Sequence, residues 1–240
     1  MSSTAVRHHT RRAAFTLVEL LVVIAVVAVL AGLLLPALAS ARSRAHRAVC
    51  QSNLHQMGLG IQMYADDHGG LFPETTHQAV GTNQSWIFTL RPYLGNTDRV
   101  RVCPSDALGK ERVAHQSTSY VPNEYVAVDR RDAFGRVLES YRNLNALKRP
   151  VETILTFESS DNPDKLSLFS DHTHSRNWHK GWTAVLEDIQ PDRHRTGRAA
   201  SDHSRGAANY LYACGHVLSL DARKLKERVD LGENIARPPD

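Results

Sequence analysis

The order of apolar and polar residues divides the chain into two regions. From Leu20 through Ala41 no side chain carries a charge. The apolar stretch from Phe15 to Leu35 is long enough to cross a bilayer, since an α-helix rises about 1.5 Å per residue. Pro36 ends the strongest part of this stretch, but a proline can bend a helix without ending it. The first region therefore predicts a helix that spans a membrane.

A narrower apolar stripe follows. Apolar side chains recur at steps of four, three, four and three residues from Cys50 to Tyr64, with polar residues between them. This spacing places them on one face of a helix. The glycine pair within His68 to Gly70 is a typical helix stop. We therefore expect one helix from near Thr16 to about Asp66, with its first half in lipid and its second half packed on a soluble head.

Shorter patterns in the rest of the chain predict that this head is small and mixed. Helical spacing, alternation and turn residues each mark brief segments. They comprise a helix at 86–94, strands at 119–128 and 153–158, a hairpin over 209–220 that turns at Cys214-Gly215, a helix at 221–229, and loops at 162–163 and 188–206. The predicted fold class is α+β, a long amino-terminal helix packed on a small, mostly antiparallel sheet.

Composition and charge narrow the classes of partner. The 240 residues are 42% apolar and 22% charged, which is ordinary for a folded protein. The formal net charge is +4, but three arginines precede Phe15, and without them it is +1. Basic clusters such as the one at 221–230 alternate with acidic residues, which is typical of a solvated helix face. We therefore expect no nucleic-acid partner.

Two interpretations of the amino-terminal segment compete. The first is an ordinary secretory signal peptide, because Ala37-Leu38-Ala39 fits a small-x-small cleavage pattern and Ser40 would begin the mature chain. In that case the protein would be a secreted periplasmic enzyme or metal-binding protein. Against it, the apolar run exceeds a usual signal core, and Glu19 lies at its start. A carboxylate costs roughly 2.5–3.5 kcal/mol at the centre of a span, and less near its edge.

The second interpretation gives Glu19 a purpose. The string Phe15-Thr16-Leu17-Val18-Glu19, after a short basic leader and before a chargeless helix, resembles the type IV prepilin signature. The resemblance implies cleavage between Ala14 and Phe15 by a prepilin peptidase, and methylation of the new Phe15 amine. It also implies that Glu19 pairs with the amine of a neighbouring subunit during assembly. The family usually has Gly before the cut, where this chain has Ala14.

Later segments are similar to a pseudopilin group of type II secretion, a G-like group with an enlarged head. They are Cys50–Pro73, Val102–Asp106 (VCPSD), Arg149–Ser160 and Ala208–Leu220. The group has a carboxyl-terminal His-x9-Asp-Gly motif, and this chain departs from it. His203 is followed by ten residues and then Cys214-Gly215. Any role of the missing carboxylate is therefore in doubt.

The resemblance implies a domain plan and a cellular setting. We expect a leader at 1–14, the membrane and amphipathic helix at 15–66, and the head at 67–240. The implied function is that of a structural pilin or pseudopilin subunit without enzymatic activity. Its implied partners are prepilin peptidase, other subunits, an inner-membrane assembly platform and membrane lipid. The protein would cross the inner membrane once, with a cytoplasmic amino terminus and a periplasmic head, before it enters a filament.

The three cysteines are too few for a disulfide scaffold and match no zinc spacing. Outside the inner membrane the environment is oxidising, so a disulfide between Cys50 and Cys103 is permitted. Buried free thiols are the alternative. Cys214 would have no partner in a disulfide.

No metal site or catalytic residue is assigned from the sequence. His172 and His174 would share a face if they lay on a strand, but no His-Glu-x-x-His pattern occurs and loop histidines are the simpler interpretation. Asp161, Asn162 and Asp164 offer oxygen ligands, yet their spacing matches no known calcium loop. No Gly-x-Ser-x-Gly motif surrounds Ser159 and Ser160. We therefore expect no cofactor, with calcium as the one alternative.

Overall fold

The computed structural model describes residues 16–75, 86–95, 97–162, 171–195 and 199–240. The chain forms two compact units, Met1–Ala41 and Arg42–Asp240. The long helix α1 (Leu17–Asp67) contributes residues to both. The predicted helix is therefore confirmed to within one residue at each end, and Pro36 lies inside it.

Helix α1 ends because two glycines adopt a conformation that other residues avoid. Gly69 and Gly70 have φ angles of 66° and 86°, in the left-handed region that glycine enters without steric cost. The Gly70 N–H donates back to the Ala65 carbonyl at 2.7 Å. The predicted stop signal is thus confirmed.

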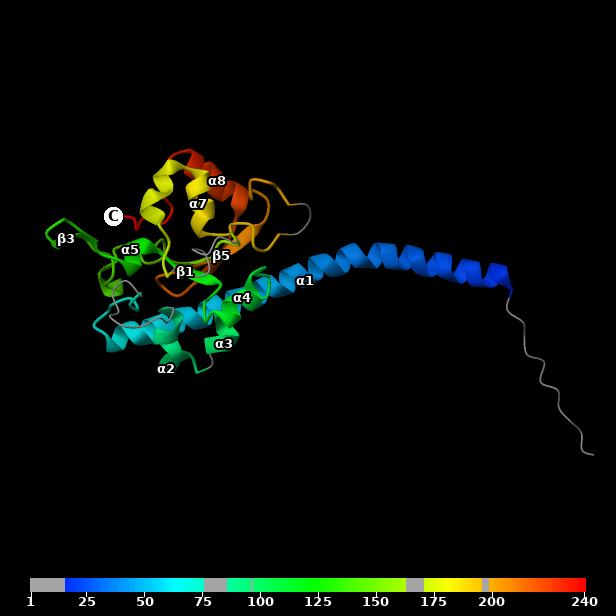
Figure 1. The fold of residues 1–240 in the computed structure, drawn as a ribbon, viewed down its shortest axis with the longest axis horizontal. Coiled ribbons are helices and arrows are strands. Elements are labelled where there is room, and N and C mark those ends of the chain that lie inside the picture. The colour runs from blue at the N-terminus through cyan, green and yellow to red at the C-terminus, as the bar shows by residue number, and fades with distance from the viewer. Residues whose placement is uncertain (1–15, 76–85, 96, 163–170, 196–198) are drawn as a thin grey trace, which may run out of the picture. The chain divides into compact units, whose positions relative to one another are not determined.

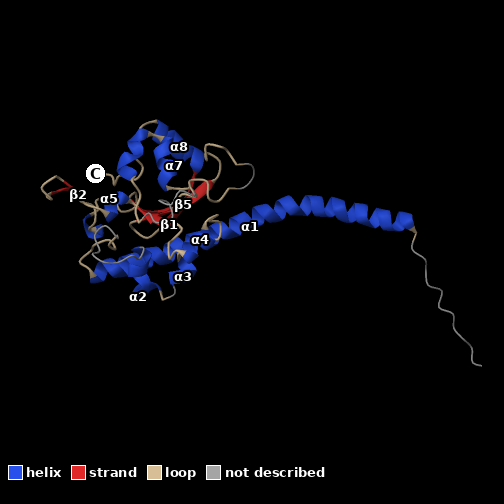
Figure 2. Ribbon diagram, in the orientation of Figure 1, coloured by secondary structure: helices blue, strands red, loops and turns tan. Residues whose placement is uncertain are grey.

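The head is built on a four-stranded antiparallel sheet with the order β1-β4-β5-β6. Figure 2 shows these strands among the helices and loops of the head. The strands are β1 (Tyr120–Pro122), β4 (Ile154–Glu158), β5 (Ala207–Tyr212) and β6 (Val217–Asp221). The predicted α+β class, strand β4 and the carboxyl-terminal hairpin are confirmed.

Both faces of this sheet are covered. One face contributes Tyr120, Leu155 and Leu211 to a core that includes the buried stripe of α1. The other face contributes Phe157 and Tyr210 to a second core. That second core also contains residues of α7 (Trp182–Asp188) and α8 (Ala222–Asp230). Figure 1 shows β1 and β5 between these helices and the carboxyl-terminal half of α1. Tyr210 and Leu211 are adjacent on β5 and lie in different cores because side chains alternate between the faces of a strand. On β4, Leu155 and Phe157 are two residues apart, and a register shift between Ile154 and Thr156 interrupts the alternation there.

One strand is shorter than the sequence predicts. The segment 119–128 forms strand only over β1, because Asn123 begins a helical turn, α5 (Glu124–Ala127). The Asn123 side chain accepts a hydrogen bond from the Tyr125 N–H, which is the usual role of an asparagine at a helix start. A local cap therefore overrides the strand preference of the residues after it.

The remaining elements are short. They are η1 (Trp86–Leu90), α2 (Arg91–Leu94), α3 (Thr97–Val100), α4 (Gly109–Ala114), β2 (Arg130–Arg131), β3 (Val137–Glu139), η2 (Leu144–Ala146) and η3 (Ser175–Lys180). The helix expected at 86–94 is thus a 3₁₀ turn followed by one α-turn.

Candidate functional site

The first candidate site is the amino end of α1. The expected cleavage and methylation site, Ala14 and Phe15, lies outside the described residues. Glu19 is described and stands in the first turn of the helix. Its Oε2 accepts hydrogen bonds from the N–H and the hydroxyl of Thr16, at 2.8 and 2.7 Å.

Thr16 and Glu19 form a reciprocal cap. The Glu19 N–H donates to the Thr16 hydroxyl oxygen at 3.2 Å. A threonine and a glutamate three residues apart that bond each other's backbone N–H form a capping box. The carboxylate therefore satisfies donors that the helix start leaves free.

The helix that begins here has the composition of a membrane span. Among the described residues, α1 contains one stretch long and apolar enough to cross a bilayer. Its large apolar side chains from Leu17 to Leu38 are exposed in the chain by itself. Such a surface is costly in water and favourable in lipid.

The second candidate site lies inside the head. Four side chains that can bind metal meet there, and their ligand atoms all lie within 4.8 Å of one another. They are Cys50 on α1, Cys103 after α3, Glu158 on β4 and His194 after α7. Each is at most 3% exposed. We refer to these four residues as the Cys-Glu-His cluster.

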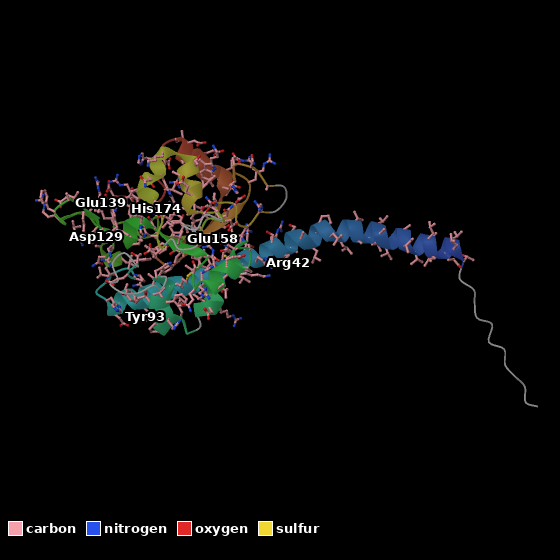
Figure 3. All side chains as sticks on the ribbon, viewed as in Figure 1. Arg42, Tyr93, Asp129, Glu139, Glu158 and His174 are labelled. Atoms are coloured by element: carbon pink, nitrogen blue, oxygen red, sulfur yellow. The ribbon has the colours of Figure 1, made fainter. Side chains whose placement is uncertain are left out.

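Glu158 is at the centre of the contacts within the cluster. Its Oε1 accepts a hydrogen bond from the Cys50 thiol at 2.8 Å and lies 2.9 Å from Nε2 of His194. Nε2 of His194 also lies 3.9 Å from the sulfur of Cys103. Figure 3 labels Glu158 within the head. One carboxylate oxygen and one imidazole nitrogen thus connect the two thiols.

Further polar groups surround the cluster. The hydroxyl of Tyr120 lies 3.0 Å from the Cys50 sulfur. The backbone N–H of Asn209 donates to the second oxygen of Glu158 at 3.3 Å. These contacts orient one thiol and the carboxylate, since a buried polar group needs partners.

The cluster changes the acidity of its members. Burial by itself would raise the pKa of the Cys103 thiol, but hydrogen bonds with Cys50 and His194 lower this pKa to about 7. Burial would lower the pKa of His194, but its bonds to Cys103 and Glu158 raise it to about 9. Burial raises the pKa of Cys50. The two thiols are therefore unlike each other, although they are neighbours.

A buried ion network adjoins the cluster. Asp106 lies between two guanidinium groups, 2.6 Å from Nε of Arg112 and 3.3 Å from an amino nitrogen of Arg193. Burial opposes ionisation of Asp106, but the two arginines hold its pKa below the usual value. Arg193 also pairs with Asp161. The VCPSD segment thus supplies Cys103 to the cluster and Asp106 to the network.

The structure brings together some of the residues singled out from the sequence. Cys50 and Cys103 are neighbours, and both thiols are free. Their pairing as a disulfide stays a prediction. Cys214 is exposed, with its sulfur 2.7 Å from Nδ1 of His216. His203, from the altered motif, contacts Asp192 instead of the cluster.

The other candidate ligands lie elsewhere. His172 and His174 occupy a loop before η3, so the loop interpretation is confirmed; His172 contacts Asp171 and His174 contacts Asp188. Of the calcium candidates, Asp161 pairs with Arg193, while Asp164 lies outside the described residues.

Sequence reasoning missed Glu158 and His194 as partners of the cysteines. Glu158 ends a strand that is otherwise free of charge, Ile154 to Phe157. A carboxylate in such a strand is a usable signal, because charged groups are seldom fully buried without a partner. His194 has no comparable local signal.

Two known protein families match segments in the amino-terminal part of the chain. Residues 9–35 match the prokaryotic N-terminal methylation motif. Residues 39–136 match a family described as a protein of unknown function (DUF1559). No curated protein and no solved structure matches the chain. Together with the apolar helix, the two matches make the chain prepilin-like.

Proposed function

We propose that this protein is a structural pilin or pseudopilin subunit. The observation that carries the proposal is the continuity of the methylation motif, residues 9–35, with an apolar helix whose first turn holds Glu19. Prepilin peptidase would cut between Ala14 and Phe15, and the new amine would be methylated. The mature chain would then join a filament through its apolar helix.

In this proposal, Glu19 sets the position of one subunit's helix relative to the next during assembly. Cleavage creates an ammonium at Phe15, one helical turn before the carboxylate. A lone charge in lipid is expensive, and pairing with an opposite charge reduces the cost. When the Phe15 ammonium of an adjacent subunit reaches Glu19, the pair fixes the axial position of one helix against the next.

The same proposal implies a cellular location and a set of partners. The chain would cross the inner membrane once, with its head in the periplasm, and would meet the assembly platform and other subunits there. Its role would be structural and not catalytic. Incorporation into a pilus and into a secretion pseudopilus both use this mechanism.

The position of the mature amino terminus tests the processing step. The chain is expressed with a prepilin peptidase, and the amino-terminal peptide is identified by mass spectrometry. We expect N-methyl-Phe15 as the first residue, and the same start in Ala14→Gly, which keeps a small residue before the cut. A mature chain that starts at Ser40 would instead establish an ordinary signal peptide and refute the proposal.

Substitution of Glu19 tests the assembly step separately. Glu19→Ala and Glu19→Gln should both be processed normally. Their recovery in sheared filaments should fall by at least about tenfold, since leaving a partner charge unpaired in a low-dielectric environment costs several kcal/mol. Normal incorporation of both variants would contradict a role for the charge.

A further inference from the structure

The insertion and assembly steps proposed above rest on α1 and Glu19 and leave the Cys-Glu-His cluster unexplained. Its members come from four separate segments of the chain, and each is buried. We propose that Cys50, Cys103, Glu158 and His194 bind one zinc ion inside the head. The site would be a structural one, closed by four protein ligands.

The types of ligand favour zinc over other divalent ions. Two thiolates, one imidazole and one carboxylate provide the sulfur, nitrogen and oxygen ligands that zinc takes in four-coordinate sites. Calcium and magnesium prefer shells made entirely of oxygen. Zinc has no redox chemistry, which suits a site sealed from solvent.

The spacing of the ligand atoms is close to that of a tetrahedral site. With zinc–sulfur distances of about 2.3 Å and zinc–nitrogen or zinc–oxygen distances of about 2.0–2.2 Å, neighbouring ligand atoms lie roughly 3.3–3.8 Å apart. The sulfur of Cys103 and Nε2 of His194 are 3.9 Å apart. The two contacts of Glu158 Oε1, at 2.8 and 2.9 Å, are shorter. They would open by roughly 0.4–1.0 Å as the ion replaces the protons between these atoms.

The surroundings are arranged as an outer shell. The Tyr120 hydroxyl can donate to a Cys50 thiolate, and the Asn209 N–H holds the outer oxygen of Glu158 so that the other oxygen faces the cluster. Such second contacts orient ligands and strengthen metal binding. Within the described residues, Nδ1 of His194 is buried without a hydrogen-bond partner. Among these residues, the outer contacts therefore reach Cys50 and Glu158 and not the imidazole of His194.

A zinc ion would offset most of the negative charge of its ligands. Two thiolates and one carboxylate with a doubly charged ion leave a net charge of −1. Arg193, the residue before His194, is also buried, and its guanidinium pairs with Asp106 and Asp161. Binding releases the two thiol protons and any proton on Nε2 of His194.

Zinc would connect the long helix to the rest of the head. Cys50 belongs to α1, whereas Glu158 belongs to the central strand β4. A metal that joins distant segments contributes its binding free energy to folding. The ion would thus hold the head on the helix that carries the assembly surface.

Metal analysis of the full-length chain tests the site. The chain is purified in detergent from zinc-supplemented cells, and zinc is measured by mass spectrometry of the digested sample. We expect about one zinc per chain, as for a closed structural site. Cys50→Ser, Cys103→Ser and His194→Ala should lose most of it. Cys214→Ser, which changes the exposed cysteine, should keep it.

A second measurement avoids variants that fold poorly. Wild-type chain is exchanged with cobalt(II), and a thiolate-to-cobalt absorption band is expected in the near ultraviolet. Intact mass after alkylation gives the number of free thiols. A chain without stoichiometric metal would overturn the proposal, whether Cys50 and Cys103 are then found as free thiols or as a disulfide.

Discussion

Thr16 and Glu19 form reciprocal hydrogen bonds at the start of α1. The N–H and hydroxyl of Thr16 donate to one oxygen of Glu19, and the Glu19 N–H donates back to the hydroxyl. The charged carboxylate is therefore already stabilised by local donors before it meets any other chain. On assembly, the proposed partner amine competes with these local bonds or joins them.

Removal of the Thr16 hydroxyl should separate capping from charge. In Thr16→Val, Glu19 keeps its charge and the backbone N–H of residue 16 but loses the hydroxyl. Loss of a helix cap costs about 1 kcal/mol, so we expect normal processing and about a fivefold loss of filament incorporation. Thr16→Ser, which keeps the hydroxyl, is the control and should assemble normally. A defect as severe as that of Glu19→Ala would show that the cap, and not the charge, controls assembly.

The close approach of α1 to the sheet at Gly58 predicts a packing defect. A Cβ atom at this position would lie 2.8 Å from Cδ1 of Leu211 on β5. Alanine favours a helix over glycine by about 1 kcal/mol, but overpacking typically costs 1–3 kcal/mol. We expect Gly58→Ala to lower the free energy of unfolding by about 1 kcal/mol, measured by urea denaturation of the chain in detergent.

A compensating change makes this interpretation specific. Leu211→Val shortens the side chain that the new methyl group meets. The double variant should be more stable than the sum of the two single effects predicts, as for residues in contact. If the effects of the two substitutions simply add, the destabilisation by Gly58→Ala does not come from contact with Leu211.

The pair of His174 and Asp188 should make stability depend on pH. Nδ1 of His174 lies 3.1 Å from Asp188, which raises the pKa of the histidine above its usual value. Glu124 and Asp171 add to this effect. Figure 3 labels His174 on the head. A raised folded-state pKa gives stability that is present below the unfolded pKa and is lost as pH rises through the folded value.

Comparison of wild type with His174→Gln at two pH values measures this contribution. The wild type should gain less than about 1 kcal/mol over the variant at pH 5.5, because the histidine side chain is 63% exposed and its ion pair is screened. The gain should vanish at pH 8.5 and shrink in high salt. The His174 backbone N–H and Trp178 continue to bond Asp188 in the variant. A larger gain at pH 8.5 would contradict the assignment.

Several elements could be predicted because their causes are local. Helix α1 follows from its apolar run, its stripe and the stop at Gly69 and Gly70. The β5–β6 hairpin follows from alternation and from Gly215, which turns with a φ of 86°. The strand expected at 119–128 was wrong beyond Pro122, because the cap at Asn123 acts over two residues and outweighs a strand preference spread over many.

The glycines of α1 show where local reasoning ends. From the sequence, Gly58 and Gly60 are only points where the helix is weak. In the structure, a Cβ on either would meet a leucine side chain at 2.8 Å, Leu211 or Leu94. Helix propensity depends on the residue and its neighbours in the chain. The need for a small side chain depends on segments far away in the sequence.

The sequence by itself determined the leader motif, the membrane helix and the α+β class of the head, because periodicity and motifs are written in consecutive residues. Only the tertiary structure decided that Cys50 and Cys103 meet Glu158 and His194. These contacts join positions up to 108 residues apart. The physical reason is that the order of the strands and the packing of α1 on the sheet determine which distant side chains are buried next to one another.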